Sequence, residues 1–231
     1  MNMENGSNET VQDLLRQATE FERHGQIREA IEAFEKSYEL EKRGWILQHI
    51  GNLYSQTGQL DEAIKIFQKI VDKIPEFPGG HYGLGLSYYR VARVQEAIEQ
   101  LEKTVELDPG YMTARYWLGI AHFHRGELDE AMRVYHELLQ VAPSFTVAWY
   151  HLGVAAAQKG DNDETIRAFT KVLETNPRSF AAHYHVGIAE FRKGNLDEAI
   201  DSLKKALLIN PDHKKAKDNL RSLEDMRLRF S

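Results

Sequence analysis

The stretch FAAHYHVGIAEFRKGNLDEAIDSLKKALLINPDH, residues 180–213, decides the fold class of this chain. Its apolar residues recur three and four positions apart on both sides of Gly194, which is the spacing of an amphipathic helix. The Gly-Asn pair in the middle favours a tight turn. The acidic pair Asp197-Glu198 suits the positive N-terminus of a helix, and Pro211 cannot continue one. The stretch therefore predicts two helices around a short turn.

The marker residues of this stretch recur along the chain at a spacing of 34 residues. They are a closing Pro, a turn Gly and an Ala early in the second helix, and their series are Pro75, Pro109, Pro143, Pro177 and Pro211; Gly58, Gly126, Gly160 and Gly194; and Ala63, Ala97, Ala131 and Ala199. Repetition at a fixed period is typical of repeat architectures. We therefore divide most of the chain into six repeats, at 11–43, 44–77, 78–111, 112–145, 146–179 and 180–213.

Further columns run through the same repeats. They are the Leu-Gly pairs 84–85, 118–119 and 152–153, Tyr54 and Tyr88 three residues after a column Gly, and Phe34, Phe67 and Phe169. Together with the turn Gly, the Ala and the Pro, these columns resemble the tetratricopeptide repeat over residues 11–213. The resemblance implies an all-α fold, a right-handed α-solenoid of stacked helix-turn-helix repeats in which each repeat contacts its neighbours. Six residues depart from the columns: Ala156, His122 and Glu190 in the Tyr column, and Arg115, His81 and His183 in a column that often holds Trp or Leu.

The two ends of the chain lie outside the six repeats. We expect residues 1–10 to form a flexible N-terminus. The tail at 214–231 holds apolar residues at helical spacing, namely Ala216, Leu220, Leu223 and Met226. Because a repeat array must cover its last repeat, we predict a C-terminal capping helix here. The six basic residues of the tail, against three acidic ones, leave open a helix that binds a membrane surface or a nucleic acid.

The overall composition is that of a soluble globular protein, with 231 residues, 42% of them apolar and 28% charged. The absence of Cys excludes a disulfide framework, a thiolate zinc site and a Cys nucleophile. No stretch approaches the ~18 apolar residues of a membrane-spanning helix. The start MNMENGSNET lacks the parts of a secretory signal, so we expect a cytoplasmic protein. A formal charge of −6 argues against a nucleic-acid partner.

No motif for catalysis or cofactor binding stands out, and we expect no enzymatic activity, no cofactor and no metal. The Gly-rich run at 78–85 lacks the Lys-Ser/Thr of a phosphate-binding loop, and it predicts an unusually flexible helix instead. One observation favours an enzyme or a metal-binding protein instead. It is a set of four histidines that we expect to lie in one groove: His49, His124, His151 and His185. A metal titration tests that reading.

The resemblance implies a concave groove lined by the first helix of each repeat, at its second, fifth, sixth, ninth, twelfth and thirteenth positions. Nine of these thirty positions in repeats two to six are aromatic, against 10% of the chain, and only two are charged. Such a face has the composition of an interface core. The candidate binding residues are Trp45, His49, Asn52, Tyr82, Tyr89, Arg90, Tyr116, Trp117, Ile120, Phe123, His124, Tyr150, His151, Tyr184, His185, Ile188, Phe191 and Arg192. The four tyrosines at the fifth position either bind a ligand or belong to the framework.

These features predict a non-catalytic scaffold or adaptor for protein–protein interactions, which binds an apolar or aromatic peptide or helix in its groove. The alternative is a homo-oligomeric scaffold that assembles through contacts between its groove and a terminal helix, as in magnetosome-associated members of the resembled family. The Lys, Asn and Arg pattern by which chaperone-binding members clamp a terminal carboxylate has no match here. We expect a protein or peptide partner, including a second copy of the chain, and neither nucleic acid nor membrane insertion.

Overall fold

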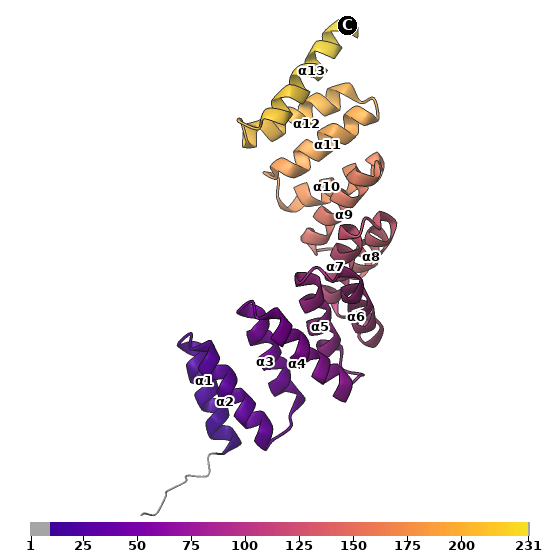
Figure 1. The fold of residues 1–231 in the computed structure, drawn as a ribbon. Helices are drawn as coiled ribbons and strands as arrows, with labels where there is room; N and C mark the ends of the chain where they lie inside the picture. Colours follow the sequence, from indigo (N-terminus) through magenta and orange to yellow (C-terminus); the bar gives the residue numbers. More distant parts are fainter. Residues whose placement is uncertain (1–9, 231) are drawn as a thin grey trace, which may run out of the picture. The chain divides into compact units, whose positions relative to one another are not determined.

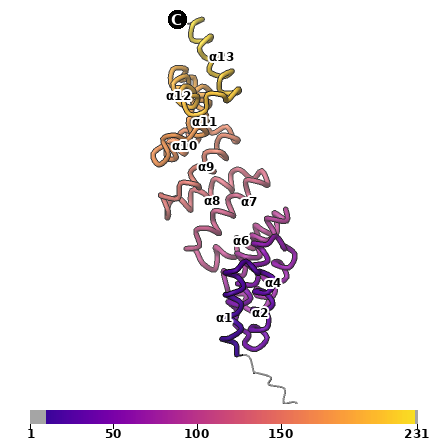
Figure 2. Tube along the Cα trace, turned by 90° about the vertical axis from the view of Figure 1, so that its left-hand side faces the viewer, coloured from indigo at the N-terminus to yellow at the C-terminus, as the bar shows by residue number. Residues whose placement is uncertain are grey.

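A computed structural model describes residues 10–230, which form thirteen α-helices and no strand (Figure 1). The predicted flexible segment at 1–10 lies almost entirely outside these described residues. The chain divides into two compact units, one ending at Ala114 and the other beginning at Arg115. In each unit, consecutive helices lie next to one another in chain order (Figure 2).

Unit 1 contains three helix pairs. Its helices are α1 (Val11–Arg23), α2 (Ile27–Leu40), α3 (Gly44–Gln56), α4 (Leu60–Lys73), α5 (Pro78–Arg90) and α6 (Val94–Leu107). Each helix packs on the next, and α3 also contacts α5, so that the first helices of neighbouring pairs line up. This is the stacking that the 34-residue period predicts.

Unit 2 continues the pattern. Its helices are α7 (Met112–His124), which begins just before the division, α8 (Leu128–Val141), α9 (Thr146–Lys159), α10 (Asn162–Thr175), α11 (Phe180–Arg192), α12 (Leu196–Ile209) and α13 (Lys214–Phe230). Consecutive helices from α8 to α13 pack on each other, and α9 contacts α11 as α3 contacts α5. The predicted fold class, an all-α solenoid of helix-turn-helix repeats, is confirmed.

The column residues act at the ends of the helices. The turn between the two helices of a pair holds one residue with positive φ, which is Gly in every case except Ala92, at 61°. Glycine adopts this left-handed conformation without the steric penalty that a Cβ brings. The column prolines each follow the C-cap of the second helix, as Pro75 follows Ile74 after α4.

A second column of glycines lies where the two helices of a pair pack together, and its members are Gly51, Gly85, Gly119, Gly153 and Gly187. A Cβ on Gly51 would lie 2.8 Å from the Phe67 ring, and one on Gly153 would lie 2.8 Å from Phe169. Such distances are well below van der Waals contact, so only glycine lets the aromatic ring of the second helix lie against the first. Gly83 in the Gly-rich run meets the Phe67 ring from the following pair of helices, where a Cβ would lie 2.2 Å from that ring. The run at 78–85 is therefore a buried packing surface, and the expectation of a merely flexible helix misread it.

Two groups of departures from the columns have a structural explanation. His81, Trp149 and His183 occupy one column, and each ring nitrogen bonds the carbonyl oxygen of the preceding column Pro, at 2.8, 2.9 and 3.0 Å. In the Tyr column, the His122 Nδ1 lies 2.7 Å from Glu127, and Glu190 accepts a hydrogen bond from Asn195 at 2.6 Å. These polar pairs span the turn between the two helices.

The last helix, α13, docks on α12 as a further first helix would. Leu223 is buried in a cluster with Ala199, Ile200 and Leu203. Arg227 of α13 lies 3.4 Å from Asp197, which repeats the links of Lys193 to Asp163 one repeat earlier and of Lys159 to Asp129 two repeats earlier.

Arg221 of α13 stands 34 residues after Gly187. A Cβ on Gly187 would lie 3.0 Å from Leu203, on the second helix of the same pair. An Arg in that column does not permit the close approach of a second helix. This replacement supports the prediction that α13 is a cap.

Candidate functional site

The eighteen predicted groove residues lie on the first helices α3, α5, α7, α9 and α11, but they differ in access to solvent. Ile120 is only 5% exposed and belongs to the core, because the apolar spacing of its helix turns it inward. It is removed from the candidate site. Eleven others are half-buried: His49, Tyr82, Tyr89, Tyr116, Trp117, Phe123, Tyr150, His151, Tyr184, His185 and Ile188. The exposed ones are Trp45, Asn52, Arg90, His124, Phe191 and Arg192.

The tyrosines at the fifth position pack on aromatic residues at the end of their own repeat. The ring centroids of Tyr82 and Tyr111 lie 4.9 Å apart, and those of Tyr116 and Phe145 lie 5.6 Å apart. Tyr184 lies 5.6 Å from His213 in the same way. These contacts support a framework role for the column, although each ring keeps one partly exposed side.

The histidines at the sixth position are held by aromatic rings of the preceding pair. His185 stacks on Phe169 with centroids 4.8 Å apart and planes 3° apart, and His151 stacks on Tyr135 at 6.2 Å. Burial lowers the pKa of both imidazoles, and the nearby Arg192 and Lys215 lower the pKa of His185 further.

His49 in unit 1 is held differently. Its Nε2 lies 2.8 Å from a Glu22 carboxylate oxygen, and its ring packs edge-on against Phe34. Within residues 10–230, no group of three or more His, Asp and Glu side chains is placed to hold a metal ion.

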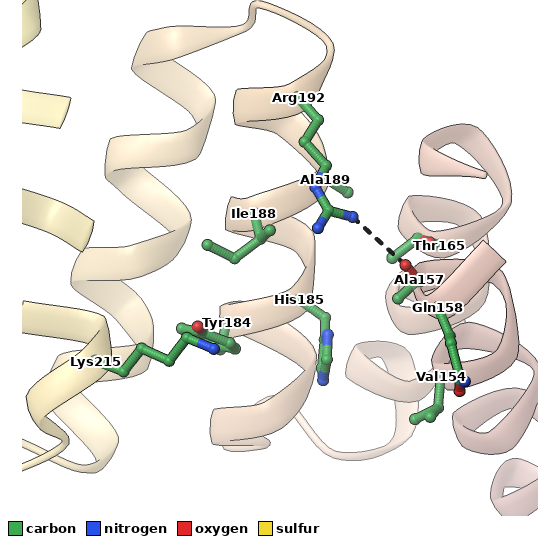
Figure 3. Close-up of a pocket in the computed structure, with 10 residues that line it drawn as sticks. All are labelled: Val154, Ala157, Gln158, Thr165, Tyr184, His185, Ile188, Ala189, Arg192 and Lys215. Atoms are coloured by element: carbon green, nitrogen blue, oxygen red, sulfur yellow. Dashed lines mark hydrogen bonds between the residues drawn. The ribbon is translucent and has the colours of Figure 1, made fainter. Parts of the chain in front are cut away.

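A cavity of about 270 Å³ opens between α9 and α11 in unit 2 (Figure 3). Figure 3 shows side chains of α11 facing those of α9 across it, with a lysine reaching in from α13. Its lining residues are Val154, Ala157, Gln158, Thr165, Tyr184, His185, Ile188, Ala189, Arg192 and Lys215. Four of these, on α11, are among the residues predicted from the sequence.

A second cavity of about 340 Å³ adjoins the first, between α11 and α13. It is lined by Tyr184, Ile188, Phe191, Arg192, Lys215, Asn219, Ser222, Leu223 and Met226. Four residues line both cavities: Tyr184, Ile188, Arg192 and Lys215. We call the two joined cavities the C-terminal groove.

The sequence prediction missed the contribution of α13 to this groove, because it treated the tail only as a cap. Lys215, Asn219, Ser222 and Met226 stand at the second, sixth, ninth and thirteenth positions of a seventh first helix. Counting the 34-residue period one repeat further would have found all four. The C-terminal groove therefore extends from α9 across α11 to α13.

The charges of the C-terminal groove are all positive. Arg192 donates a hydrogen bond from its guanidinium to the Ala157 carbonyl oxygen at 3.4 Å, as the dashed line in Figure 3 marks. Lys215 enters from the opposite side. No Asp or Glu lines either cavity, and neither cation forms an ion pair with any carboxylate of residues 10–230.

The other predicted residues are not brought into this groove. Trp117 and Phe123 lie on α7, and Tyr82, Tyr89 and Arg90 lie on α5. Arg90 reaches back to the Ser55 carbonyl oxygen at 2.6 Å, which is the counterpart of the Arg192 contact. Tyr150, on α9, packs edge-on against Phe169. These residues remain candidates without a cavity assigned to them.

Comparison with known proteins identifies the repeat. Models of the tetratricopeptide repeat match residues 46–73, 82–144 and 150–214, which is more than half of the chain. The predicted first repeat at 11–43 lies outside these matches. Comparison with curated proteins found no match. No helix among residues 10–230 combines the length and apolar character needed to cross a membrane.

Several solved structures resemble the chain. YrrB, described as a TPR protein with an unusual peptide-binding site, is 26% identical, with a TM-score of 0.75 over 83% of this chain and 99% of its own. MamA is 32% identical, with a TM-score of 0.66 over 73% of this chain and 97% of its own.

A third structure shows the fold alone. It is the C-terminal part of a TPR repeat-containing protein from Cytophaga hutchinsonii, which is 19% identical, with a TM-score of 0.78 over 93% of this chain and 89% of its own. Proteins of this repeat class are generally non-catalytic interaction scaffolds. The comparisons support that class of function for this chain.

Proposed function

Because the chain belongs to the tetratricopeptide repeat family, we propose that it is an interaction scaffold that holds an apolar or aromatic peptide segment or helix in the C-terminal groove. The groove is formed by α9, α11 and α13, all within unit 2. Its partner is a protein or peptide rather than a small metabolite, because the two cavities are open and follow the length of α11.

The observation that carries this proposal is the pair of adjoining cavities. Their shared lining, which includes Tyr184 and Ile188, joins two apolar recesses that lie on either side of α11. At the outer edge, Phe191 is 39% exposed and Met226 is 36% exposed. Large apolar side chains left open beside a concavity are typical of a protein-binding surface.

The likeness to YrrB is consistent with this function, since that protein is described as having a peptide-binding site. The proposed site in this chain is nevertheless argued from its own lining residues. Aromatic and methionine side chains are enriched at interfaces, and Tyr184, Phe191 and Met226 bring three of them to one groove.

Selection from a display library of random peptides against the full chain tests the proposal. Selected peptides should lose about 1–3 kcal/mol of binding free energy on Phe191→Ala or Met226→Ala, which is the range of interface hot spots. Leu208→Ala is the matched control, because Leu208 is 82% exposed on α12 and outside the C-terminal groove. Circular dichroism should be unchanged in all three variants.

Two results would argue against the proposal. Peptides that bind all three variants as well as the native chain would place the binding site elsewhere. A mass that rises with protein concentration, and that falls back to one chain in Phe191→Ala, would favour the self-assembling scaffold instead. Sedimentation equilibrium of the native chain and the variant measures this.

A further inference from the structure

The C-terminal groove has a charge pattern that its apolar character does not explain. We propose that it selects peptides in which an acidic side chain lies between two apolar side chains, with the carboxylate held by Arg192 and Lys215. This inference rests on the proposed function and specifies its ligand. The two cations come from different helices, α11 and α13, and each lines both cavities.

The position of the cations sets the order of the ligand's side chains. Val154 and Ala157 line the recess on one side of the shared residues, and Leu223 and Met226 line the recess on the other. An extended peptide that passes along the groove would place one apolar side chain in each recess. The residue between them would then face Arg192 and Lys215.

The charges of these two residues are not neutralised by the protein. Two carboxylates on the same helices have other partners, because Glu190 accepts from Asn195 at 2.6 Å and Glu224 pairs with Lys204 at 2.9 Å. The lowered pKa of His185, to which both cations contribute after burial, indicates that their positive potential reaches the floor of the groove. Two cations that line the same groove favour a carboxylate and disfavour a basic ligand.

The geometry also favours an internal acidic residue over a terminal carboxylate. Because apolar lining continues on both sides of the cation pair, a chain that ended at the cations would leave one recess empty. Arg192 donates one guanidinium N–H to the Ala157 carbonyl oxygen, and its other N–H groups stay available for a carboxylate. We therefore assign the anion to an Asp or Glu side chain within the peptide.

Capped peptide libraries test this assignment on the full chain. Three libraries have Leu, Ile, Met and Phe on both sides of a central residue, Ser and Gly elsewhere, and blocked ends, and they differ only in a central Asp, Asn or Lys. The Asp library should be captured about tenfold better than the Asn library, as expected for a partly shielded charge contact, and less well at high salt. Arg192→Gln and Lys215→Gln should each remove most of this preference.

Matched variants separate a specific contact from general attraction. Lys214→Gln removes the same charge one residue away, outside the lining of either cavity, and should change the capture less than about twofold. Lys215→Glu should reverse the preference, so that the Lys library is captured better than the Asp library. Circular dichroism confirms that each variant is folded.

Several outcomes would overturn the inference. Equal capture of the Asp and Asn libraries would remove the role of the cations. Stronger capture of an Asn peptide with a free C-terminal carboxylate would move the anion to the chain end, and stronger capture of a phosphoserine peptide would replace the carboxylate by a phosphate. If the random display library yields groove-dependent peptides without an acidic residue, the proposed function stands and this inference fails. If it yields no groove-dependent peptide, both fail.

Discussion

Helix α5 in unit 1 and helix α11 in unit 2 occupy the same place in the repeat, three repeats apart, but they meet the preceding aromatic ring in opposite ways. On α5 the sixth residue is Gly83, and the Phe67 ring fills the space where a side chain would begin. On α11 the sixth residue is His185, and its imidazole stacks flat on Phe169.

The difference shows how one column serves two purposes. Phe67 and Phe169 are both almost fully buried, so the core is preserved in both units. A glycine brings the neighbouring helix onto the ring, whereas a histidine covers the ring and at the same time forms a wall of the C-terminal groove. The Phe67 ring therefore closes the space next to α5, whereas the Phe169 ring lies behind a wall of the C-terminal groove.

Exchanging these residues should give the largest effect. Gly83→His forces a side chain into the Phe67 ring and should lower the free energy of unfolding by about 3 kcal/mol. His185→Gly should lower it by about 2 kcal/mol, through lost contact area and the poor helix propensity of glycine. Urea unfolding followed by circular dichroism measures both. A tolerated Gly83→His would contradict the close packing of α5.

The turns that follow α5 and α11 also differ, and the effect of changing them should be smaller. The turn after α5 holds Ala92 at φ 61°, whereas the turn after α11 holds Gly194 at 87°. Ala92→Gly should raise the free energy of unfolding by up to about 1 kcal/mol, because it relieves the strain of a Cβ in left-handed backbone. Gly194→Ala should lower it by a similar amount. A loss of stability on Ala92→Gly would show that the native turn is not strained.

The two units also differ in the ion pairs that join one helix pair to the next, and this difference should have a smaller effect. Unit 2 repeats an Asp–Lys/Arg link three times, whereas in unit 1 the corresponding partner of Asp61 is Val91. A double-mutant cycle on Asp163 and Lys193 should give a small favourable coupling that falls with added salt. Val91→Lys should create a similar coupling to Asp61, and a cycle with no coupling would show that the register differs between the units.

The pH dependence of stability should differ between the native chain and a variant that lacks the two stacked histidines of unit 2. Burial holds the pKa of His151 and His185 below the ordinary value of 6.5, so the unfolded chain takes up protons first as the pH falls. Stability should therefore be fully present above about pH 6.5 and be lost as the pH falls from there through the lowered pKa values.

The test of this effect is the double variant His151→Gln/His185→Gln. It should flatten the pH dependence of unfolding between about pH 7.5 and 5, measured by urea titration at each pH. An unchanged slope would mean that the two imidazoles are as solvated in the folded chain as in the unfolded one.

Much of the fold could be predicted from the sequence, because the restraints involved are local. A Gly in the turn, a Pro after the C-cap and apolar residues three and four apart act within one pair of helices, and the structure places each where the 34-residue period predicts. The same logic predicted that Tyr184, His185, Ile188 and Arg192 lie on one face of a first helix. It could not decide Ile120, which shares the ninth position with Ile188 but is buried.

Only the tertiary structure decided which part of the predicted face becomes a groove. The sequence by itself determined the repeat, its register and the low charge of the first helices. The cavities lie between α9, α11 and α13, and the His185 ring that stacks on Phe169 lines the first of them, so the groove depends on contacts between residues many positions apart. Lys215 becomes a groove residue for the same reason, because the docking of α13 through Leu223 and Arg227 brings it to the groove that Arg192 lines from α11.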